Sequence, residues 1–429
     1  MRSGEMTLIE PPDVFARQGP SVATSPPGDF GSAPAMVSVD EAIRLILAQG
    51  VVRAFEGVPL NEAGGRILAS AILARRMAPA CDVAAMDGYA VRDADMTAEW
   101  NALTVIGKSF AGHGFAGVVP AGAAVRIFTG APVPEGADRV VVQEDTQRIR
   151  SQVILPRPSG KRHIRPAGSD FGAGDVLVDA GVPLTPRRLV AAAAADIAEV
   201  IAFARPRVTI VATGDELRAP GADLHRKDSI PESVTFGIAE LARIFGGEAR
   251  VHPRLPDDLD RLQAAAGAIL EASDIVVITG GASVGEHDYS RDMFARSGLR
   301  IHFSKVSMRP GKPVWFGKAG QACILGLPGN PTAAMVTARL FLAPLIAAMA
   351  GRDARTALGW RSRPIVEALE PTGAFECFLG ARLAEEAVSA SANRDSSAQR
   401  ALAATDTLIR RRAHAPAAAP GDLVETLDF

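Results

Sequence analysis

Short apolar runs alternate with amphipathic segments between residues 206 and 351. The runs at 208–212 and 275–279 consist of apolar and β-branched residues, a pattern typical of strands that are buried on both faces of a sheet. A helix is expected between them, ending at Gly246-Gly247. Its apolar side would be formed by Ile238, Leu241, Ile244 and Phe245. This alternation predicts an open α/β domain with a mostly parallel sheet.

Two other regions have the period of short strands. Apolar runs at 103–106, 124–128, 139–142 and 153–156 are separated by turn residues, which predicts a small β-rich domain. The chain becomes polar after Arg352. From Leu402 to Leu427 apolar and polar positions alternate again, and this predicts a C-terminal β domain.

Helices are expected on either side of the β-rich region. Ser38 can cap a helix, with Glu41 three residues later as in a capping box and an apolar face following it. The alanine-rich stretch at 189–202 also has the composition of a helix. Residues 1–36 are rich in Pro, Gly, Ser and Ala and have no sustained period, which predicts a disordered leader.

Composition and charge narrow the class of protein. The chain has 429 residues, of which 48% are hydrophobic and 22% charged, and its net charge is −2. This length favours about three domains. The near-neutral charge disfavours nucleic-acid binding as the main role.

The cysteines and the hydropathy of the chain indicate where in the cell the protein is expected. Cys81, Cys323 and Cys377 form no CxxC pair, which argues against a disulfide framework or a structural zinc site and favours a reducing, cytoplasmic location. The N-terminus lacks a continuous apolar signal region, and the long apolar run at 333–350 is interrupted by Arg339 and Pro344. We therefore expect neither secretion nor a membrane span.

The strongest chemical signal in the α/β region follows the expected strand at 275–279. Gly280, Gly281 and Gly285 lack a Cβ, so backbone N–H groups can approach an anion, and Ser283 adds a hydroxyl donor. Glu286 and Asp288 would repel a bare phosphate, which favours a metal ion between anion and carboxylates. The alternative is a glycine-rich turn with solvated acids.

Three further strand ends carry glycines or charges. They lie at 213–216, 305–312 and 326–331, and the carboxyl ends of parallel strands meet at one edge of a sheet. Lys305, Arg309 and Lys312 would then face the acidic loop, as phosphate or oxyanion transfer requires. The alternative, a set of surface ion pairs worth under about 1 kcal/mol each, would not explain the flanking glycines.

Six motifs occur in order along the chain. They are Met86-Asp87-Gly88-Tyr89-Ala90, Thr129-Gly130-Ala131-Pro132, Thr213-Gly214-Asp215-Glu216-Leu217, Gly280-Gly281-Ala282-Ser283-Val284-Gly285, Pro310-Gly311-Lys312-Pro313 and Gly326-Leu327-Pro328-Gly329-Asn330-Pro331. As a set they resemble the molybdopterin molybdenumtransferase family, of the MoeA and gephyrin E-domain type. The resemblance extends from residue 37 to the C-terminus.

The resemblance implies a multi-domain α/β plus β fold. Its parts would be a split linker domain at 37–69 and 161–205, a β-rich second domain at 70–160, a MogA-like open α/β domain at 206–352 that binds molybdopterin, and a C-terminal β-barrel-like domain at 353–429. It also implies a homodimer whose cleft lies between the α/β domain of one subunit and the β-rich domain of the other.

The implied reaction is the insertion of molybdate into adenylyl-molybdopterin, with release of AMP and dependence on Mg²⁺. A metal and cationic side chains would neutralise charge on the cleaved phosphoanhydride, so no covalent nucleophile is needed. The adenylyltransferase that acts before this step and the molybdoenzymes that accept the product are the further partners implied.

Matching positions imply roles for individual residues. Glu216, Asp257 and Asp288 would bind the metal and, with Lys305 and Arg309, form the catalytic set. Lys305 and Arg309 would attract molybdate, and the glycine loop would hold the phosphate end of the pterin. The implied pterin-binding set is Thr213, Gly214, Asp215, Gly280, Gly281, Ser283, Val284, Gly285, Lys312, Pro328, Gly329, Asn330 and Pro331, with Asp82, Met86, Asp87, Thr129 and Asp170 on the opposite wall.

Several positions differ from the usual family pattern. Val83-Ala84 replaces Asn-Ser, Ser169 replaces an acid, Glu232-Ser233-Val234 replaces Asp-Ser/Thr-Asn, and Arg309 replaces Lys. Each hydrogen bond lost in this way is worth about 0.5–1.5 kcal/mol. A second hypothesis is therefore a non-catalytic protein that binds or carries molybdopterin or molybdenum cofactor. A third, an adenylyltransferase of the MogA or CinA type, would share only the α/β domain.

Overall fold

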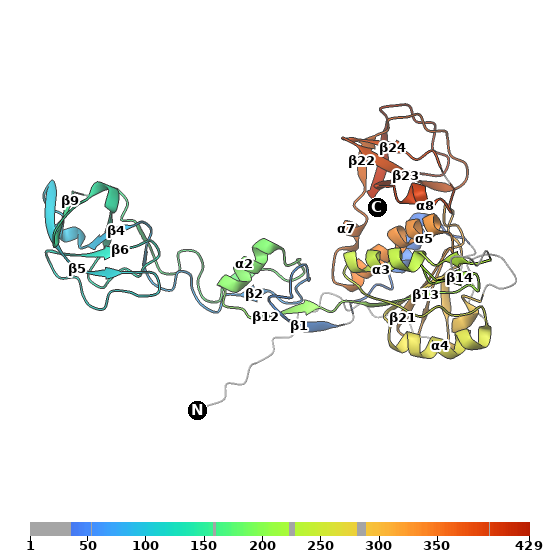
Figure 1. Ribbon diagram of the computed structural model, residues 1–429, viewed down its shortest axis with the longest axis horizontal. Helices are drawn as coiled ribbons and strands as arrows, with labels where there is room; N and C mark the ends of the chain where they lie inside the picture. Colours follow the sequence, from blue (N-terminus) through green and yellow to red (C-terminus); the bar gives the residue numbers. More distant parts are fainter. Residues whose placement is uncertain (1–35, 53, 158–159, 223–227, 281–288, 394) are drawn as a thin grey trace. The chain divides into compact units, whose positions relative to one another are not determined.

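The computed structural model describes residues 36–52, 54–157, 160–222, 228–280, 289–393 and 395–429. These residues form two compact units. Unit 1 comprises Met1–Glu56 and Phe203–Phe429, and unit 2 comprises Gly57–Ala202. The two units are described separately below, and both are drawn in Figure 1.

The centre of unit 1 is a six-stranded sheet. Its order is β16 (Glu248–Val251), β13 (Arg207–Ala212), β17 (Ile275–Thr279), β21 (Ala322–Leu327), β20 (Trp315–Ala319) and β18 (Arg300–Phe303). The first four strands are parallel to one another, whereas β20 and β18 are antiparallel to their neighbours. The expected open α/β sheet is confirmed, with its parallel strands on one side and an antiparallel pair on the other.

Alternate residues of the parallel strands enter two different cores. Ile210, Val277 and Leu325 belong to a cluster with apolar residues of α1 (Val39–Leu47), α3 (Val234–Ile244), α5 (Pro331–Thr337) and α6 (Ala343–Met349). Val276 and Ile324, one residue away in their strands, pack instead with α4 (Leu259–Glu271). Figure 1 shows α4 and α3 on opposite sides of these strands. Burial on both faces is the physical reason for the continuous apolar runs in the sequence.

The start of α1 agrees with the sequence signal at Ser38, and α4 begins with a cap of the same kind. Ser38 caps α1, because its hydroxyl oxygen accepts a hydrogen bond from the backbone N–H of Glu41 at 3.2 Å. Asp258 caps α4 in the same way through the N–H of Arg261 at 3.0 Å. One expectation for α3 was wrong, since Ile238 and Leu241 are buried but Ile244 is 63% exposed. Ile244 is the last residue of α3, where the apolar side leaves the core.

A continuous helical run from α5 to α6 covers Pro331–Met349 and includes a π-helix at Ala338–Leu342. The run is long and apolar enough to cross a bilayer, but 83% of its most apolar window is buried inside the protein. Helices of protein cores meet the same criteria, so the run is weak evidence for a membrane span.

A second sheet in unit 1 is built mainly from the C-terminal residues. Its order is β19 (Met308–Arg309), β23 (Glu376–Ala384), β25 (Thr407–Arg411), β26 (Leu423–Asp428) and β22 (Arg361–Pro364), and β24 (Ala387–Ala390) also pairs with β23. The edge strand β19 comes from the basic loop that was assigned to the α/β region, and it runs parallel to β23. This pairing attaches the basic loop to the C-terminal sheet.

Unit 2 is centred on another six-stranded sheet, as the short apolar runs predicted. Its order is β7 (Arg139–Val142), β4 (Gly88–Val91), β6 (Ala123–Ile127), β5 (Trp100–Ser109), β9 (Gln152–Pro156) and β8 (Gln147–Ile149). Strand β8 was not expected, because its residues are exposed and show no apolar alternation.

The alanine-rich stretch at 189–202 was expected to be one helix, which is wrong for its second half. Helix α2 (Pro186–Ala194) ends before Asp196, whose φ is +66°, and β12 (Glu199–Phe203) follows. Val200 and Ala202 are buried, whereas Ile201 between them is exposed, so the period changes from that of a helix to that of a strand.

The remaining elements are short. The paired strands are β1 (Phe55–Pro59) with β12, β2 (Ile72–Leu73) with β11 (Val176–Val178), β3 (Val83–Ala84) with β10 (Ile164–Arg165), and β14 (Leu217–Arg218) with β15 (Ile230–Pro231). Helices α7 (Ala354–Ala357) and α8 (Gln399–Leu402) belong to unit 1.

Candidate functional site

Three of the four predicted strand-end loops meet at the carboxyl edge of the α/β sheet. A Cβ atom built on Gly280 would lie 2.5 Å from the carbonyl oxygen of Thr213, and one built on Gly329 would lie 3.6 Å from Gly280 Cα. The N–H of Thr213 donates to the carbonyl oxygen of Thr279 at 3.1 Å. With φ at +92° as well, position 280 requires glycine both for its conformation and for this close approach.

The loop after β13 carries one predicted metal ligand, Glu216, and one predicted pterin-binding acid, Asp215. Gly214 has φ at +138°, and a Cβ atom there would lie 2.6 Å from Glu216 Oε2, so the Glu216 carboxylate folds back over this glycine. Asp215 is held differently, since its Oδ1 lies 3.8 Å from Arg254 Nη1, which also donates to the carbonyl oxygen of Gly214 at 2.9 Å.

Asp257 follows β16, the neighbour of β13 in the sheet. Leu255, two residues earlier, forms a parallel bridge with Thr213, and its N–H donates to the carbonyl oxygen of Ala212 at 3.1 Å. Glu216 and Asp257 therefore follow two segments that pair with each other beyond the ends of β13 and β16. Carboxylate oxygens are the ligands that Mg²⁺ prefers, so the chemistry of this pair suits the expected cation.

Part of the predicted site lies outside the described residues. This applies to Gly281, Ser283, Val284, Gly285 and Asp288. Within the part of the chain that the structure describes, no group of three or more His, Cys, Asp or Glu side chains is placed to hold a metal ion. The proposed third ligand, Asp288, is among the residues not described.

The basic loop is held in place at both ends. Val306 N–H donates to the carbonyl oxygen of Lys312 at 3.0 Å, and the carbonyl oxygen of Lys305 accepts from Val37 N–H at 3.0 Å. Between these points, Arg309 pairs in register with Cys377 of β23. The cations Arg309 and Lys312 are therefore carried by a loop whose backbone is paired on two sides.

Phe375 is a site residue that the sequence did not indicate. Its ring centre lies 4.6 Å from Arg309 Cζ and 5.3 Å from Lys312 Nζ. Cations at such distances are attracted to the negative face of an aromatic ring. No motif marked Phe375, because it lies more than sixty positions from the cations, and only the pairing of β19 with β23 brings it near them.

A pocket of about 540 Å³ opens beside this loop. Arg309, Lys312, Pro328 and Asn330 line it, so the structure brings these four predicted residues together. The far wall comes from the C-terminal sheet and the segment before α8, where Ser396 Oγ accepts a hydrogen bond from Asn330 Nδ2 at 2.9 Å. The side-chain contacts between the two walls show that the C-terminal region contributes to the site, which the sequence motifs did not suggest.

The predicted site residues of unit 2 also gather in part. Asp87 Oδ1 accepts hydrogen bonds from the N–H and the hydroxyl of Thr129, at 2.8 Å and 2.7 Å. These bonds, the backbone one first, hold the pKa of the Asp87 carboxyl below its usual value. The first two motifs are therefore joined directly, although they lie 42 residues apart.

Asp82 and Asp170 lie around a neighbouring loop of unit 2. Asp82 Oδ1 accepts from the N–H of Ala167 at 2.8 Å, and Asp170 N–H donates to the carbonyl oxygen of Ala78 at 3.0 Å. Met86 is 43% exposed. The bond from Ala167 to Asp82 thus fixes the loop that leads to Asp170. The Asp82 carboxylate therefore stabilises the local fold in addition to its predicted role in binding.

Three of the departures from the family pattern, at Ala84, Glu232 and Val234, have local explanations. Ala84 is 1% exposed within the core of unit 2, where an apolar residue packs well. The Glu232 carboxylate caps the start of α3 by accepting from the N–H and hydroxyl of Thr235 at 2.9 Å and 2.6 Å. Val234, 9% exposed, joins the core beside α1. These three residues serve packing and capping in this chain.

Comparison with known proteins matches most of the chain. A family described as MoeA N-terminal region (domain I and II) matches residues 37–195, and one described as probable molybdopterin binding domain matches residues 209–348. The chain is 36% identical over 339 residues to a molybdopterin molybdenumtransferase of Haemophilus influenzae, covering 78% of this chain and 81% of that protein. It is 34% identical over 366 residues to one of Synechococcus elongatus, covering 82% and 89%.

A solved structure has a similar fold. It is a molybdopterin biosynthesis MoeA protein from Pyrococcus horikosii, with a TM-score of 0.80 and 26% identity. The match covers 92% of this chain and 99% of that chain.

Proposed function

Since this chain belongs to the molybdopterin molybdenumtransferase family, a family of transferases in molybdenum cofactor biosynthesis, we propose that it inserts molybdate into adenylyl-molybdopterin and releases AMP. The observation that carries the proposal is the meeting of Thr213, Gly280 and Gly329 at one sheet edge. Glycines at this edge allow backbone N–H groups to approach a phosphate, and carboxylates and cations lie on neighbouring segments.

The cationic loop would attract and orient the substrate oxyanion. Arg309 and Lys312 are exposed, line the 540 Å³ pocket and share one aromatic partner, so their charges are directed toward a common region. Fixed positive groups of this kind stabilise charge that develops during phosphoanhydride cleavage and cost no reorganisation at that moment. Lys305, which is not among the residues that line the pocket, would add to the attraction at longer range.

Glu216, Asp257 and Asp288 would hold a divalent cation, which we propose is Mg²⁺. When bound, this cation would neutralise charge on the phosphoanhydride of adenylyl-molybdopterin. The chain's own contribution would be to orient the carboxylates of Glu216 and Asp257, which follow paired segments after β13 and β16. The donor set consists of oxygen ligands, as a hard cation requires.

We also propose a homodimer that acts in the cytoplasm, in which Asp82, Asp87, Thr129 and Asp170 of one subunit complete the site of the other. One feature of the single chain supports this proposal. Thr129 donates two hydrogen bonds to Asp87, so these two side chains are already held in place. Prearranged polar groups at a cleft wall lower the cost of ordering them when substrate binds.

AMP release tests the reaction. Purified protein with adenylyl-molybdopterin, molybdate and Mg²⁺ should release AMP, and omission of molybdate or chelation of Mg²⁺ should prevent this. Asp288→Asn should abolish AMP release and leave pterin affinity within about tenfold, because the glycine loop is retained. Tight pterin binding by the wild-type protein without any AMP release would refute insertion and establish the carrier function instead.

A further inference from the structure

Two aromatic rings of unit 2 stack just beyond the ends of β5 and β6. Side chains alternate along a strand, so Arg126 and Phe128 point away from the side of Ile127, which is fully buried. Strand β5 runs parallel to β6 with Ser109 paired to Ile127, so the next residues, Phe110 and Phe128, lie side by side. Their ring centres are 4.7 Å apart and their planes differ by 8°.

Phe110 is the outer ring of this stack. Phe128 covers one of its faces, and Phe110 is 43% exposed, so a further planar ring can stack on it at the separation usual for aromatic pairs. A single exposed phenylalanine is common on protein surfaces. The polar groups fixed beside this stack are what point to a ligand.

Arg126 fixes the inner ring. Its Cζ lies 4.8 Å from the ring centre of Phe128 and 5.1 Å from that of Tyr89. One terminal nitrogen donates to the carbonyl oxygen of Gly88 at 2.9 Å, and the other donates to Gln143 Oε1. Phe128 therefore contacts a guanidinium group that is itself held by two hydrogen bonds, which gives the stack a fixed base.

A carboxylate lies beside the stack. Asp87 Oδ1 accepts two hydrogen bonds from Thr129, the residue that follows Phe128. These bonds and the positive charge of Arg126 hold the pKa of the Asp87 carboxyl below its usual value, so the group is ionised at neutral pH. Oδ2 accepts no hydrogen bond from the described part of the chain, and it is therefore available to an N–H donor of a ligand.

The stack and the carboxylate together select among planar rings. A carboxylate oxygen favours a ring edge with N–H donors and repels an edge with an acceptor nitrogen. The pyrimidinone edge of a pterin has two neighbouring donors, its 2-amino group and its N3–H. Adenine instead has the acceptor N1 beside its amino group. Of the two ring systems in an adenylylated pterin, the pterin is therefore the one that fits beside Asp87.

We propose that Phe110 and Phe128 form the stacking surface for the pterin ring of the substrate, and that Asp87 Oδ2 accepts hydrogen bonds from the 2-amino edge of this ring. The inference rests on the proposed function and its shared cleft, in which Asp87 and Thr129 lie on the wall opposite the glycine loop that holds the phosphate end of the pterin. The two phenylalanines then determine specificity for the ring, although neither belongs to the six motifs along the chain.

Fluorescence titration of the full-length protein with unsubstituted pterin tests the surface without turnover. Stacking should quench the pterin fluorescence, and Phe110→Leu should weaken pterin affinity at least about fivefold, because the outer ring face is lost. Phe110→Tyr keeps the ring and should bind pterin like the wild-type protein. Circular dichroism verifies that the leucine protein is folded.

Lumazine, the 2,4-dioxo analogue of pterin, tests the carboxylate separately from the stack. It keeps the fused ring but has an oxygen in place of the 2-amino group, so the wild-type protein should prefer pterin to lumazine at least about fivefold. Asp87→Asn should remove most of this preference, since the amide no longer offers a charged acceptor. Adenosine should not displace pterin.

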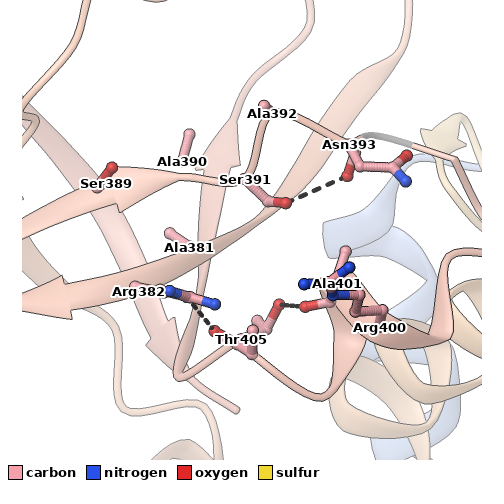
Figure 2. A pocket seen from close by; sticks show the side chains of 11 residues that line it. Ala381, Arg382, Ser389, Ala390, Ser391, Ala392, Asn393, Arg400, Ala401 and Thr405 are labelled. Carbon is pink, nitrogen blue, oxygen red and sulfur yellow. Dashed lines mark hydrogen bonds between the residues drawn. The ribbon is translucent and has the colours of Figure 1, made fainter.

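Two variants serve as controls. Phe236→Leu makes the same change at a phenylalanine of α3 that is 60% exposed. The C-terminal pocket of about 410 Å³ shown in Figure 2 has Arg382 and Arg400 in its wall, and its described lining residues include no aromatic ring, so it offers charge without a stacking surface. Phe236→Leu and Arg382→Gln should each leave pterin affinity within about twofold.

Three results would overturn the proposal. Equal pterin affinity in the wild-type and Phe110→Leu proteins, including no binding by either, would refute the stacking surface. Displacement of pterin by adenosine would assign the surface to the adenine base instead. Equal affinity of the wild-type protein for pterin and lumazine would refute the role of Asp87.

Failure of this inference can be told apart from failure of the proposed function, because the titration contains neither molybdate nor Mg²⁺. A protein that binds pterin through Phe110 but releases no AMP from adenylyl-molybdopterin would refute the proposed function and leave the stacking surface intact. A protein that releases AMP, but whose pterin affinity is unaffected by Phe110→Leu, would refute the stacking surface and leave the proposed function intact.

Discussion

The guanidinium carbon of Arg309 lies 4.6 Å from the ring centre of Phe375, and Lys312 Nζ lies 5.3 Å from the same centre. One half-buried aromatic ring therefore has contacts with two cations of the proposed molybdate-binding loop. The contact joins the loop before β20 to the start of β23, so the C-terminal sheet takes part in shaping the site.

Phe375→Leu should reduce molybdate affinity. Each cation–π contact at an exposed position is worth about 0.5–1 kcal/mol, so losing two should raise the molybdate concentration for half-maximal AMP release by about five- to thirtyfold. Phe375→Tyr keeps the ring and should behave like the wild-type protein. An equal loss in both variants would show that the ring faces do not position these cations.

Gly280→Ala should destabilise unit 1 by about 2 kcal/mol, because a Cβ would meet the Thr213 carbonyl oxygen at 2.5 Å and φ is +92°. Urea unfolding would measure the change. Gly320→Ala is the matched control, since its φ is +56° but no atom lies within 4 Å of the added Cβ. It should cost only about 1 kcal/mol, the contribution of the backbone conformation. Equal losses at both positions would argue against the close contact.

Arg410→Met should destabilise the contact between α1 and the C-terminal sheet. Arg410 is 5% exposed, forms a salt bridge with buried Glu376, and donates to Asp40 Oδ1 at 2.6 Å. Removing it leaves the Glu376 carboxylate buried without its partner, at a cost of about 3–5 kcal/mol in urea unfolding.

Arg412→Met provides the comparison for that prediction. Arg412 is 55% exposed and binds Asp40 and Glu425 at the surface, at 3.3 Å and 3.2 Å. Its removal should cost less than about 1 kcal/mol. If the two variants lose the same stability, burial of the Arg410–Glu376 pair is not what makes it important.

Thr129→Val should raise the pKa of Asp87 toward its ordinary value of 3.8 without fully restoring it. The backbone N–H of residue 129 remains as a donor, whereas the hydroxyl donor is lost. Because the pKa in the folded protein is lowered, the contribution of these bonds to stability is present above pH 3.8 and is lost as the pH falls through the lower value. Carbon-13 titration of the Asp87 carboxyl measures the shift, and an unaltered titration would contradict the role of the hydroxyl.

Mixed dimers test whether the site is shared between subunits. Asp82→Ala and Asp288→Asn proteins should each be inactive, but a dimer of one with the other contains one site with both native residues. We expect about half of wild-type AMP release from verified mixed dimers, because one of the two sites is intact. No recovery in such dimers would show that each subunit uses its own two residues.

Much of the architecture could be predicted from local pattern. The apolar runs at β13 and β17 identified a doubly covered sheet, because a strand buried on both faces needs apolar residues at consecutive positions. Ser38 marked a helix start, because its side chain accepts a hydrogen bond from the residue three positions later. The helix expected at 189–202 failed because alanine suits a helix locally, whereas burial of alternate residues selected a strand in β12.

The sequence by itself determined the family, the order of strands and helices in the α/β region, and the glycine, acidic and basic loops of the proposed site. These features depend on residues that are near in sequence or on motifs with fixed spacing. Tertiary structure alone decided that Gly280 lies against Thr213 and Gly329, that Phe375 lies beside Arg309, and that Arg382 and Arg400 face one pocket. Such contacts follow from strand pairing over long separations, for which no local preference exists until the sheets have formed.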